Sequence, residues 1–592
     1  MKKISREAFL KTSAIGVAAI LLPPNIFGNS NDVKDSIDEL MLNRLVKAND
    51  KSVERILQNL SSTQRRQYYR NLSGAFSKLT AAFSHSKSSY YESRDVLKVM
   101  NSTLEKLYKL QYPNGTLDAG GNRKSPPDTA FLLDSLCSSA MILKENDNLE
   151  LGAIKSKLDE FLQAAGEGIR TGGVHTPNHR WEISSILAKL FKLYGDKKYV
   201  ERIDQWLAEG IYQNADGNYP ERSRNYAVVE NEAFITIGEI LNRPAFFEIV
   251  SRNLVANYYY MEANGELVSL DSRRQDQFKP ISSWTIYRTY RYMAIHKNND
   301  FFASIARKIE AFAGFDRHVL DSALPHFMAS SILKRAMPKG ENLPTTYTKH
   351  FKASDLVRIK RGIITASIFG GNDLPLTVAS GRSCNPTFFT FRKGKAILEY
   401  ARLSTSFFNT GYVRSDGLQK IDNKYILKEK KEAYYYEPMP VNKRNENGDY
   451  ALTESLDGRF WSKMDFEKRP KTTLILETKI IIEEIDNAFQ MDIEIGGTEN
   501  VEITLDLCFK KGGHFEGVLQ GEKEKDFFLE NGWAKYTFEG DTVEVGPGAV
   551  EHRNVNRLDG EVYSTHFGSI KGQGQHLYIT GLVPFKHSLT IR

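Results

Sequence analysis

Apolar residues recur at helical spacing through the first half of the chain, between about residue 35 and residue 315. The clearest stripes are Leu151, Ile154, Leu158, Phe161 and Leu162, then Ile183, Ile186, Leu187, Leu190 and Phe191, then Tyr199, Ile203, Trp206 and Leu207. The last stripe is followed by Gly210, a residue type that commonly ends helices. Further helices are predicted over 228–241, 247–262, 283–296 and 300–313. Loops separate these stretches, so we expect stacked helical hairpins.

The pattern changes around residue 336, where Pro338, Gly340 and Pro344 mark a connector. Beyond it, β-rich runs cover 356–369, 472–485, 489–495, 501–509 and 576–582. Apolar and polar residues alternate strictly over 501–507, which predicts a strand with one buried face. We therefore expect an α+β multidomain chain, with a helical domain over 30–335 and an antiparallel β-sandwich over 336–592.

The N-terminus has the pattern of a signal peptide over 1–29. Lys2, Lys3 and Arg6 precede an apolar run over 14–22, which Pro23 and Pro24 close. Residues 5–11 resemble the twin-arginine export motif, but Glu7 stands where the second arginine belongs, which leaves the export route open. The apolar run is too short to span a membrane. We expect an exported protein, periplasmic or secreted, without membrane insertion.

The composition is that of a globular protein with more than one domain: 592 residues, 41% of them hydrophobic and 26% charged. The net charge of +7 is spread among acidic residues, which argues against a nucleic-acid partner and favours encounter with an anionic polysaccharide. Cys137, Cys384 and Cys508 lie far apart and have no metal-ligand spacing, so we expect three buried thiols.

Two polar segments interrupt the helical half where a scaffold of hairpins needs no reactive side chains. They are 172–181, with the sequence GGVHTPNHRW, and 216–226, with the sequence DGNYPERSRNY. Each is predicted as a loop that runs into a helix. We therefore expect their side chains to converge at one end of the helical domain.

The adjacent pair Asn178-His179, followed by Tyr226 with Asp216-Gly217 and Glu221-x-Ser223 before it, resembles the heparinase II/III and alginate lyase group. That resemblance implies an N-terminal α/α toroid, a C-terminal β-sandwich and a polysaccharide lyase that cleaves a uronic-acid-containing glycan by β-elimination. The group's carboxylate-neutralising positions map onto Asn178 and His179, and its catalytic tyrosine onto Tyr226. Many members also carry a His-rich metal-binding segment in the β-domain. No such segment occurs here, so no cofactor is required and a structural metal ion is not indicated; a looser likeness points to a divergent branch acting on rhamnose-linked glucuronate.

The chemistry explains these residue types. Removal of the C5 proton of a uronate builds negative charge on the neighbouring carboxylate, which amide, imidazole or guanidinium donors stabilise. Tyr226 can take that proton, protonate the leaving oxygen, or do both in a syn elimination, and His179 is the alternative base for an anti elimination. Arg222 and Arg224 are close enough in sequence to favour a phenolate at Tyr226.

Further residues are candidates for substrate binding or for a purely structural role. The substrate-binding candidates are His175, Arg180, Trp181, Arg222, Arg224, Arg273 and Arg274. Tyr400 or Tyr436 can serve as a second catalytic tyrosine, and His326 can reach the cleft near the domain junction. On the structural reading, Asn178 caps a helix that starts at Trp181, Tyr226 packs as an aromatic, Asp128 caps its own helix, and 428–432 is a solvated turn.

Two competing functions remain open. A glycoside hydrolase needs two carboxylates around the bond, for which Asp216 with Asp128, or Glu221 with Glu230, are available. A non-catalytic glycan-binding protein needs only a rim of aromatic residues. Only a lyase releases a product with an ultraviolet-absorbing double bond. Alginate, glycosaminoglycans and plant glucuronate gums all present the acid that the mechanism requires.

Overall fold

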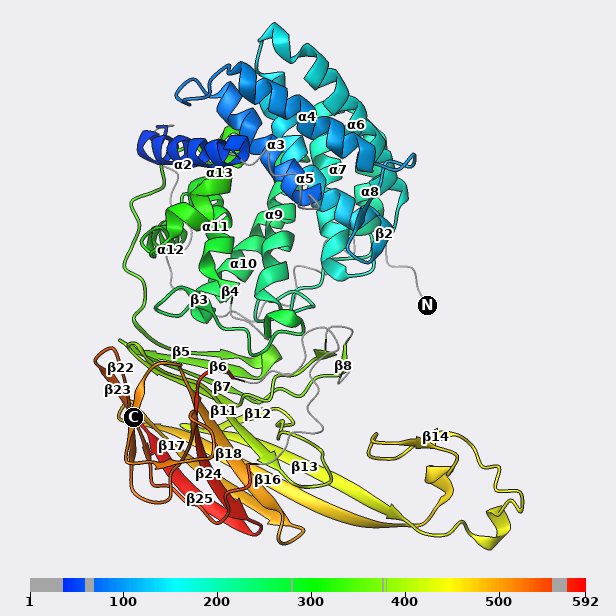
Figure 1. Cartoon of the computed structure of the whole chain (residues 1–592), viewed down its shortest axis with the longest axis vertical. Helices are drawn as coiled ribbons and strands as arrows, with labels where there is room; N and C mark the ends of the chain where they lie inside the picture. Colours follow the sequence, from blue (N-terminus) through cyan, green and yellow to red (C-terminus); the bar gives the residue numbers. More distant parts are fainter. Residues whose placement is uncertain (1–35, 59–68, 278–280, 375–376, 379–380, 556–571) are drawn as a thin grey trace. The chain divides into compact units, whose positions relative to one another are not determined.

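The computed structural model describes residues 36–58, 69–277, 281–374, 377–378, 381–555 and 572–592 (Figure 1). The predicted signal peptide lies outside these residues. The chain forms two compact units, and each contains several chain segments. Unit 1 comprises the described residues up to Val174, together with Ile183–Ile203 and Ile286–Leu343; unit 2 comprises His175–Glu182, Asp204–Thr285 and Pro344–Arg592.

Unit 1 is built from helices that bury the predicted apolar stripes. Its helices are α2 (Glu39–Gln58), α3 (Tyr69–Ser84), α4 (Arg94–Leu110), α5 (Pro126–Lys144), α6 (Gly152–Thr171), most of α7 (Pro177–Tyr194) and of α8 (Lys197–Leu207), α11 (Tyr287–His296), α12 (Asp300–Glu310) and α13 (Asp321–Ala329). A short hairpin of β1 (Leu117–Ala119) and β2 (Asn122–Ser125) precedes α5. The last helix, α13, packs on α2, α3 and α5, so the end of the unit returns to its beginning.

The start of α5 corrects one prediction about a helix cap. Ser125, not Asp128, is the N-cap: the Ser125 hydroxyl accepts a hydrogen bond from the backbone N–H of Asp128 at 3.3 Å and donates one to its Oδ2 at 2.8 Å. Asp128 lies in the first turn, where its carboxylate also pairs with Arg70 at 2.8 Å. The Ser125 hydroxyl thereby binds the backbone N–H of Asp128, which has no partner within the helix because it lies in the first turn.

Unit 2 combines a helical hairpin with two large sheets. The hairpin is α9 (Arg224–Ile240) and α10 (Ala245–Tyr260), followed by the small pair β3 (Glu266–Leu267) and β4 (Ile281–Ser282). The nine-stranded sheet has the order β20 (Leu519–Gln520), β21 (Asp526–Phe528), β24 (Gln575–Leu582), β18 (Glu502–Phe509), β11 (Ala396–Thr405), β10 (Phe389–Lys393), β7 (Ile364–Phe369), β6 (Leu356–Arg361) and β5 (Thr346–Phe351). The eight-stranded sheet has the order β12 (Leu418–Ile421), β13 (Lys424–Tyr436), β16 (Lys471–Ile485), β17 (Ala488–Gly497), β25 (Phe585–Ile591), β23 (Asp541–Gly546), β22 (Ala534–Phe538) and β19 (His514–Glu516). Short pairs are formed by β8 (Thr377–Val378) with β9 (Gly381–Arg382), and by β14 (Thr453–Glu454) with β15 (Trp461–Ser462).

The sandwich core lies between these two sheets, as the strand periodicity predicts. On β17, Phe489, Met491, Ile493 and Ile495 are buried and the residues between them are not. They join apolar residues of β7, β10, β11 and β18 in one hydrophobic cluster. All strand pairs of the two large sheets are antiparallel except β21 with β24, which is parallel.

Three predictions about the sandwich are wrong in detail. The run 356–369 is two strands, β6 and β7, and 428–432 is part of β13 rather than a turn. Both faces of β18 are covered, because the polar residues Thr504 and Asp506 are also buried.

Asp506 accepts a hydrogen bond from the Tyr400 hydroxyl at 3.2 Å and contacts His576 at 2.8 Å. Burial raises the pKa of Tyr400, and at 5% exposure its side chain has little surface that a substrate could reach.

The α9–α10 hairpin is fixed to the nine-stranded sheet within unit 2. Tyr260, the last residue of α10, stacks on Phe351 with ring centroids 4.3 Å apart. Just beyond the helix, Glu262 pairs with Arg358 of β6 at 2.8 Å, and both side chains are buried. A buried ion pair of this kind fixes relative position more than it adds stability. The loops at the start of α9 are therefore held on a rigid support.

Candidate functional site

The first of the two polar segments enters α7 earlier than predicted. The helix begins at Pro177, a favoured first residue, so Asn178 and His179 lie in its first turn and Asn178 does not cap a helix starting at Trp181. Asn178 is fully buried. Its Nδ2 donates to Glu221 Oε2 at 2.7 Å and to Thr176 Oγ1 at 3.2 Å. Its Oδ1 is buried without a hydrogen-bond partner among the described residues, which makes this amide a polar group with unused bonding capacity.

The residues next to Asn178 divide between the surface and the interior. His179 is half-buried and its ring meets that of the exposed His175 edge to face, with centroids 4.7 Å apart. Trp181 is only 2% exposed and packs against Phe234, which leaves its ring little surface for the predicted substrate contact. Arg180 lies over the Trp181 ring and pairs with Glu209 at 2.7 Å. The histidines, but not the tryptophan, are accessible to a ligand.

The second segment is a loop that closes on a helix cap. Gly217 has φ +87° and lies so close to the backbone of Arg252 that any side chain would collide with it. Arg222 also adopts a left-handed conformation, with φ +47°. Ser223 then caps α9 by accepting a hydrogen bond from the backbone N–H of Tyr226 at 3.2 Å. This geometry places Tyr226 in the first turn of α9, half-buried.

Arg224 has a structural role instead of the predicted substrate contact. It is 1% exposed, pairs with Asp271 at 2.9 Å and lies over the Tyr260 ring at 3.6 Å. Burial acts against the charge of Arg224, but Asp271, Tyr260 and Asp276 together outweigh it and raise the arginine pKa. Arg224 therefore anchors the loop over 271–277 to the start of α9, and it does not contact the Tyr226 hydroxyl.

Arg222 and Arg273 both bind the same carboxylate. Each forms an ion pair with Asp373, and the Arg273 contact is 2.8 Å long. Arg222 is 9% exposed, whereas the Arg273 side chain is 38% exposed. The expectation that Arg222 favours a phenolate at Tyr226 is wrong, because its guanidinium is directed to Asp373.

Arg274 and Gln275 are the residues that contact the Tyr226 hydroxyl. Gln275 Nε2 donates to the phenol oxygen at 2.6 Å and Arg274 Nη2 at 3.2 Å, while the Arg274 guanidinium stacks 4.3 Å from the ring centroid. The other Nη of Arg274 pairs with Glu221 Oε1. Asn178, Glu221, Arg274 and Tyr226 thus form a continuous chain of contacts, which we call the Glu221 network.

A buried carboxyl group, that of Glu230, lies one helical turn beyond Tyr226. Glu230 is 1% exposed, and its Oε1 has no hydrogen-bond partner among the described residues. Burial, and secondly the nearby Glu221 charge, raise the pKa of Glu230 well above its ordinary value, while Arg180 opposes the shift weakly. Burial therefore favours the protonated form of Glu230 over its charged form.

The carboxylate pairs considered for hydrolysis are placed differently from what that chemistry requires. Glu221 is held by Asn178 and Arg274, and Glu230 is enclosed in the interior. Asp216 accepts the backbone N–H of Ala353 at 2.7 Å, and burial raises its pKa. Two carboxyl groups on either side of a glycosidic bond must both be reachable by substrate. Glu230 does not meet that condition.

The burial of Glu230 gives a testable prediction about stability. Replacing it by Gln keeps the shape of the neutral acid and removes the group that titrates. In the unfolded chain Glu230 loses its proton above its ordinary pKa of 4.5, whereas the folded protein retains it. The wild type should therefore lose unfolding free energy relative to Glu230→Gln as pH rises above that value, by at most about 1.4 kcal/mol per pH unit.

Urea unfolding of both proteins between pH 5 and pH 8 measures this difference at roughly one-unit steps. The exposed Glu239, on the same helix, supplies the control Glu239→Gln, which should show no such divergence. Parallel stability curves for wild type and Glu230→Gln would mean that Glu230 is ionised in the folded protein.

Sequence reasoning missed Gln275 and Asp373. Gln275 lies inside a polar loop that was considered only for its arginines, and its distance from Tyr226 along the chain gives no hint of contact. Asp373 follows β7 in the sandwich half of the sequence and meets two arginines of the helical half. The high density of polar residues around Gln275 was the only feature of the sequence that pointed to this loop. Such density does not show which side chains contact each other.

The other predicted residues have structural surroundings. His326 lies in α13 of unit 1, where burial lowers its pKa to about 3. Tyr436 lies in β13, and its hydroxyl accepts the backbone N–H of Leu456 at 2.8 Å. All three cysteines are buried, as expected. Across the described ranges, no set of three or more His, Cys, Asp and Glu side chains is placed to hold a metal ion, and no helix is both long and apolar enough to cross a membrane.

Comparison with known proteins finds relatives by structure. No family model and no curated protein matches the sequence. Heparinase III is 12% identical with a TM-score of 0.54, and the alignment covers 99% of this chain and 88% of that one. The xanthan lyase of Paenibacillus is 10% identical with a TM-score of 0.55, covering 95% of this chain and 58% of that one. The chondroitin AC lyase of Streptomyces coelicolor A3, solved with chondroitin sulphate, is 11% identical with a TM-score of 0.53, covering 95% and 80%. The chain therefore has the fold of these lyases, an α/α toroid with a β-sandwich, as its sequence predicts.

Proposed function

We propose that this chain is an exported polysaccharide lyase that cleaves a uronic-acid-containing glycan by β-elimination. The observation that carries the proposal is the Tyr226 hydroxyl, which receives hydrogen bonds from both Arg274 and Gln275 at the end of the Glu221 network. The fold shared with three polysaccharide lyases supports the same reaction class. We also propose the domain limits 30–335 for the toroid and 336–592 for the sandwich, after a signal peptide over 1–29.

Tyr226 is the proton-transfer residue in this mechanism. Two N–H donors at the phenol oxygen stabilise it when it gives up its proton, and one of them carries a full positive charge. The oxygen then takes the C5 proton of the uronate and passes a proton to the departing glycosidic oxygen. The C4–O bond breaks as the C4–C5 double bond forms, so the reaction needs no water and no redox partner.

Asn178 and His179 stabilise the carboxylate on which charge develops. Asn178 Nδ2 donates to the Glu221 carboxylate, and in the proposed mechanism it turns this donor to the carboxylate of the substrate. His179 and His175 supply imidazole donors beside it. Arg274 contributes a guanidinium shared between Glu221 and Tyr226. Donors fixed in advance act most strongly on charge that appears only in the transition state.

The reaction class is tested by product absorbance. Purified protein is incubated with alginate, with several glycosaminoglycans and with plant glucuronate gums, and the ultraviolet absorbance of the C4–C5 double bond is followed. We expect the absorbance to rise with at least one of these polymers. New reducing ends without absorbance would assign the protein to the hydrolases, and binding without either signal would make it a glycan-binding protein.

Glu221 is predicted to act as a positioning residue. In Glu221→Gln the shape is kept, but the charged partner of Arg274 is lost, so Arg274 holds the Tyr226 hydroxyl less firmly. We expect turnover to fall about tenfold with little change in KM, a loss of about 1.4 kcal/mol in transition-state stabilisation. Steady-state kinetics on the active polymer measures it. Glu209→Gln, which removes an exposed partner of Arg180, is the matched control and should retain turnover.

A further inference from the structure

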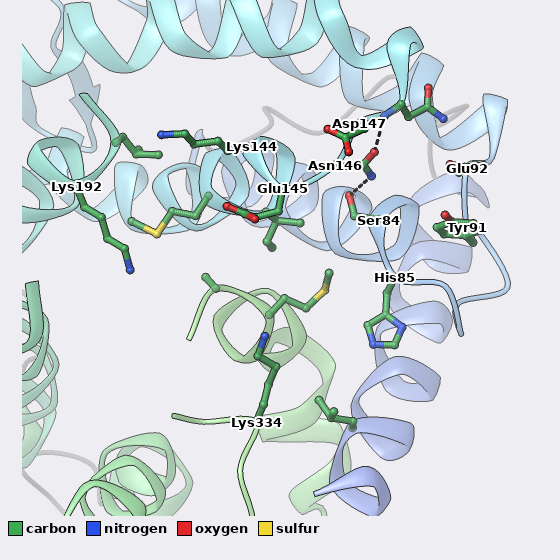
Figure 2. Close-up of a pocket in the computed structure, with 17 residues that line it drawn as sticks. Ser84, His85, Tyr91, Glu92, Lys144, Glu145, Asn146, Asp147, Lys192 and Lys334 are labelled. Atoms are coloured by element: carbon green, nitrogen blue, oxygen red, sulfur yellow. Dashed lines mark hydrogen bonds between the residues drawn. The ribbon is translucent and has the colours of Figure 1, made fainter. Parts of the chain in front are cut away.

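Unit 1 contains a cavity of about 960 Å³ that is separate from the Glu221 network. Figure 2 shows its lining, which comes from α2, from the ends of α3, α5, α7 and α13, and from the segments that follow α3, α5 and α13. All lining residues belong to unit 1. Its size falls within the range of pockets that hold small organic ligands, about 300–1,000 Å³.

Three lysines line this cavity, and each comes from a different part of the chain. Lys144 ends α5, Lys192 lies in the last turns of α7, and Lys334 follows α13. In Figure 2, Lys192 lies at the left of the opening and Lys334 extends upward from below it. Within the described part of unit 1, none of the three ammonium groups forms an ion pair or a hydrogen bond. Lys78, elsewhere in this unit, is by contrast paired with Asp321 at 2.7 Å.

The remaining lining supplies hydrogen-bond acceptors and apolar surface. Glu145 and Asp147 present exposed carboxylates, and Tyr91, which is 45% exposed, presents an aromatic ring. Met141 and Met328 add apolar contact. Carboxylates accept hydrogen bonds from hydroxyl groups, and an aromatic face suits a sugar ring. The same carboxylates repel a ligand with dense negative charge, such as a polyphosphate, but tolerate one with few and widely spaced charges.

We propose that this cavity is a second, non-catalytic glycan-binding site, which takes an oligosaccharide bearing spaced carboxylates. Lys192 and Lys334 bind the uronate carboxylates, Glu145 and Asp147 accept hydrogen bonds from sugar hydroxyls, and Tyr91 stacks on a ring at the entrance. The choice of a uronate oligosaccharide rests on the proposed function, whereas the site itself rests on the cavity and its unpaired lysines. A polymer that is bound at both the cavity and the catalytic site stays on the protein through many cleavage events, although neither site binds it more tightly.

The test uses the full chain carrying Tyr226→Phe, which suppresses turnover, and the tetrasaccharide of unsulfated chondroitin as the probe. Isothermal titration compares this protein with one that also carries Lys192→Ala and Lys334→Ala. We expect the two lysine substitutions to remove one binding event, or to weaken it at least about tenfold. The matched control carries Lys98→Ala and Lys109→Ala, on α4 outside the cavity, and should bind like the parent with the same change in net charge.

Two further arms decide the ligand chemistry. The carboxyl-reduced tetrasaccharide, which is neutral, should bind weakly to all variants, and inorganic phosphate should not displace the acidic probe. Equal binding by parent and cavity variant, equal binding of the neutral sugar, or displacement by phosphate would each overturn the proposal. The outcome is independent of catalysis. Lysine-dependent binding without any double-bond product would support this site and contradict the lyase assignment. Double-bond product without lysine-dependent binding would support the lyase assignment and contradict this site.

Discussion

Tyr226→Phe is expected to lower turnover about a thousand-fold on the polymer that the wild type cleaves, because a positioned proton-transfer group commonly contributes a hundred- to ten-thousand-fold. Phenylalanine keeps the ring and its stacking with Arg274, and removes only the oxygen that Arg274 and Gln275 contact. Folding should be nearly unchanged, since Tyr226 is half-buried in the first turn of α9. The initial rate of double-bond formation measures the loss.

The control for this substitution is Tyr435→Phe, in which a strongly exposed tyrosine of the sandwich loses the same hydroxyl. It should keep the wild-type rate. Circular dichroism and the unfolding midpoint establish that both variants are folded. A folded Tyr226→Phe protein with near-normal turnover would transfer the proton role to His179, the other candidate base, which lies in the first turn of α7.

Asn178→Ala should cost on the order of 3 kcal/mol in transition-state stabilisation, the scale seen when a donor aimed at developing charge is removed. The amide is directed at the position of a carboxylate, at present that of Glu221. Because the charge on the substrate carboxylate grows only during proton removal, kcat should fall far more than binding. Comparing kcat and KM of the variant with those of the wild type separates the two effects. His179→Ala should behave in the same direction.

Asn178 is fully buried, so its truncation also leaves space in the structure. The unfolding midpoint must therefore be measured beside the kinetics, and Asn101→Ala on the exposed face of α4 serves as the control for an asparagine substitution. A variant that binds weakly but turns over at the wild-type rate once saturated would show that Asn178 contributes to substrate affinity and not to the chemical step.

The regular elements follow from local pattern. The stripe Ile154, Leu158, Phe161 and Leu162 is buried in α6, and Phe489, Met491, Ile493 and Ile495 are buried in β17, each at the period of its own backbone. Such periodicity requires only that one face of an element be covered. It does not say whether the other face is covered too. For that reason the polar face of β18 was predicted to meet solvent, whereas Asp506 is buried against Tyr400 and His576.

The choice of partners was decided by the tertiary structure. Arg222 and Arg224 lie four and two positions before Tyr226, yet Arg224 turns inward to Asp271 and Arg222 to Asp373. The hydroxyl is met instead by Arg274 and Gln275, from a loop far along the chain. Spacing along the sequence predicts which side chains meet only within one helix or strand. In a loop that contains a left-handed residue such as Arg222, spacing does not predict where a side chain points.

The sequence alone thus determined the order of a helical half and a β-rich half, and the two short segments where reactive side chains gather, because these depend on residue type and period. The contacts from Asn178 through Glu221 and Arg274 to Tyr226, the raised pKa of Glu230 and the burial of Trp181 depend on contacts between distant segments. Those quantities exist only once the chain has folded, since the energy of a charge is set by the groups that surround it in space.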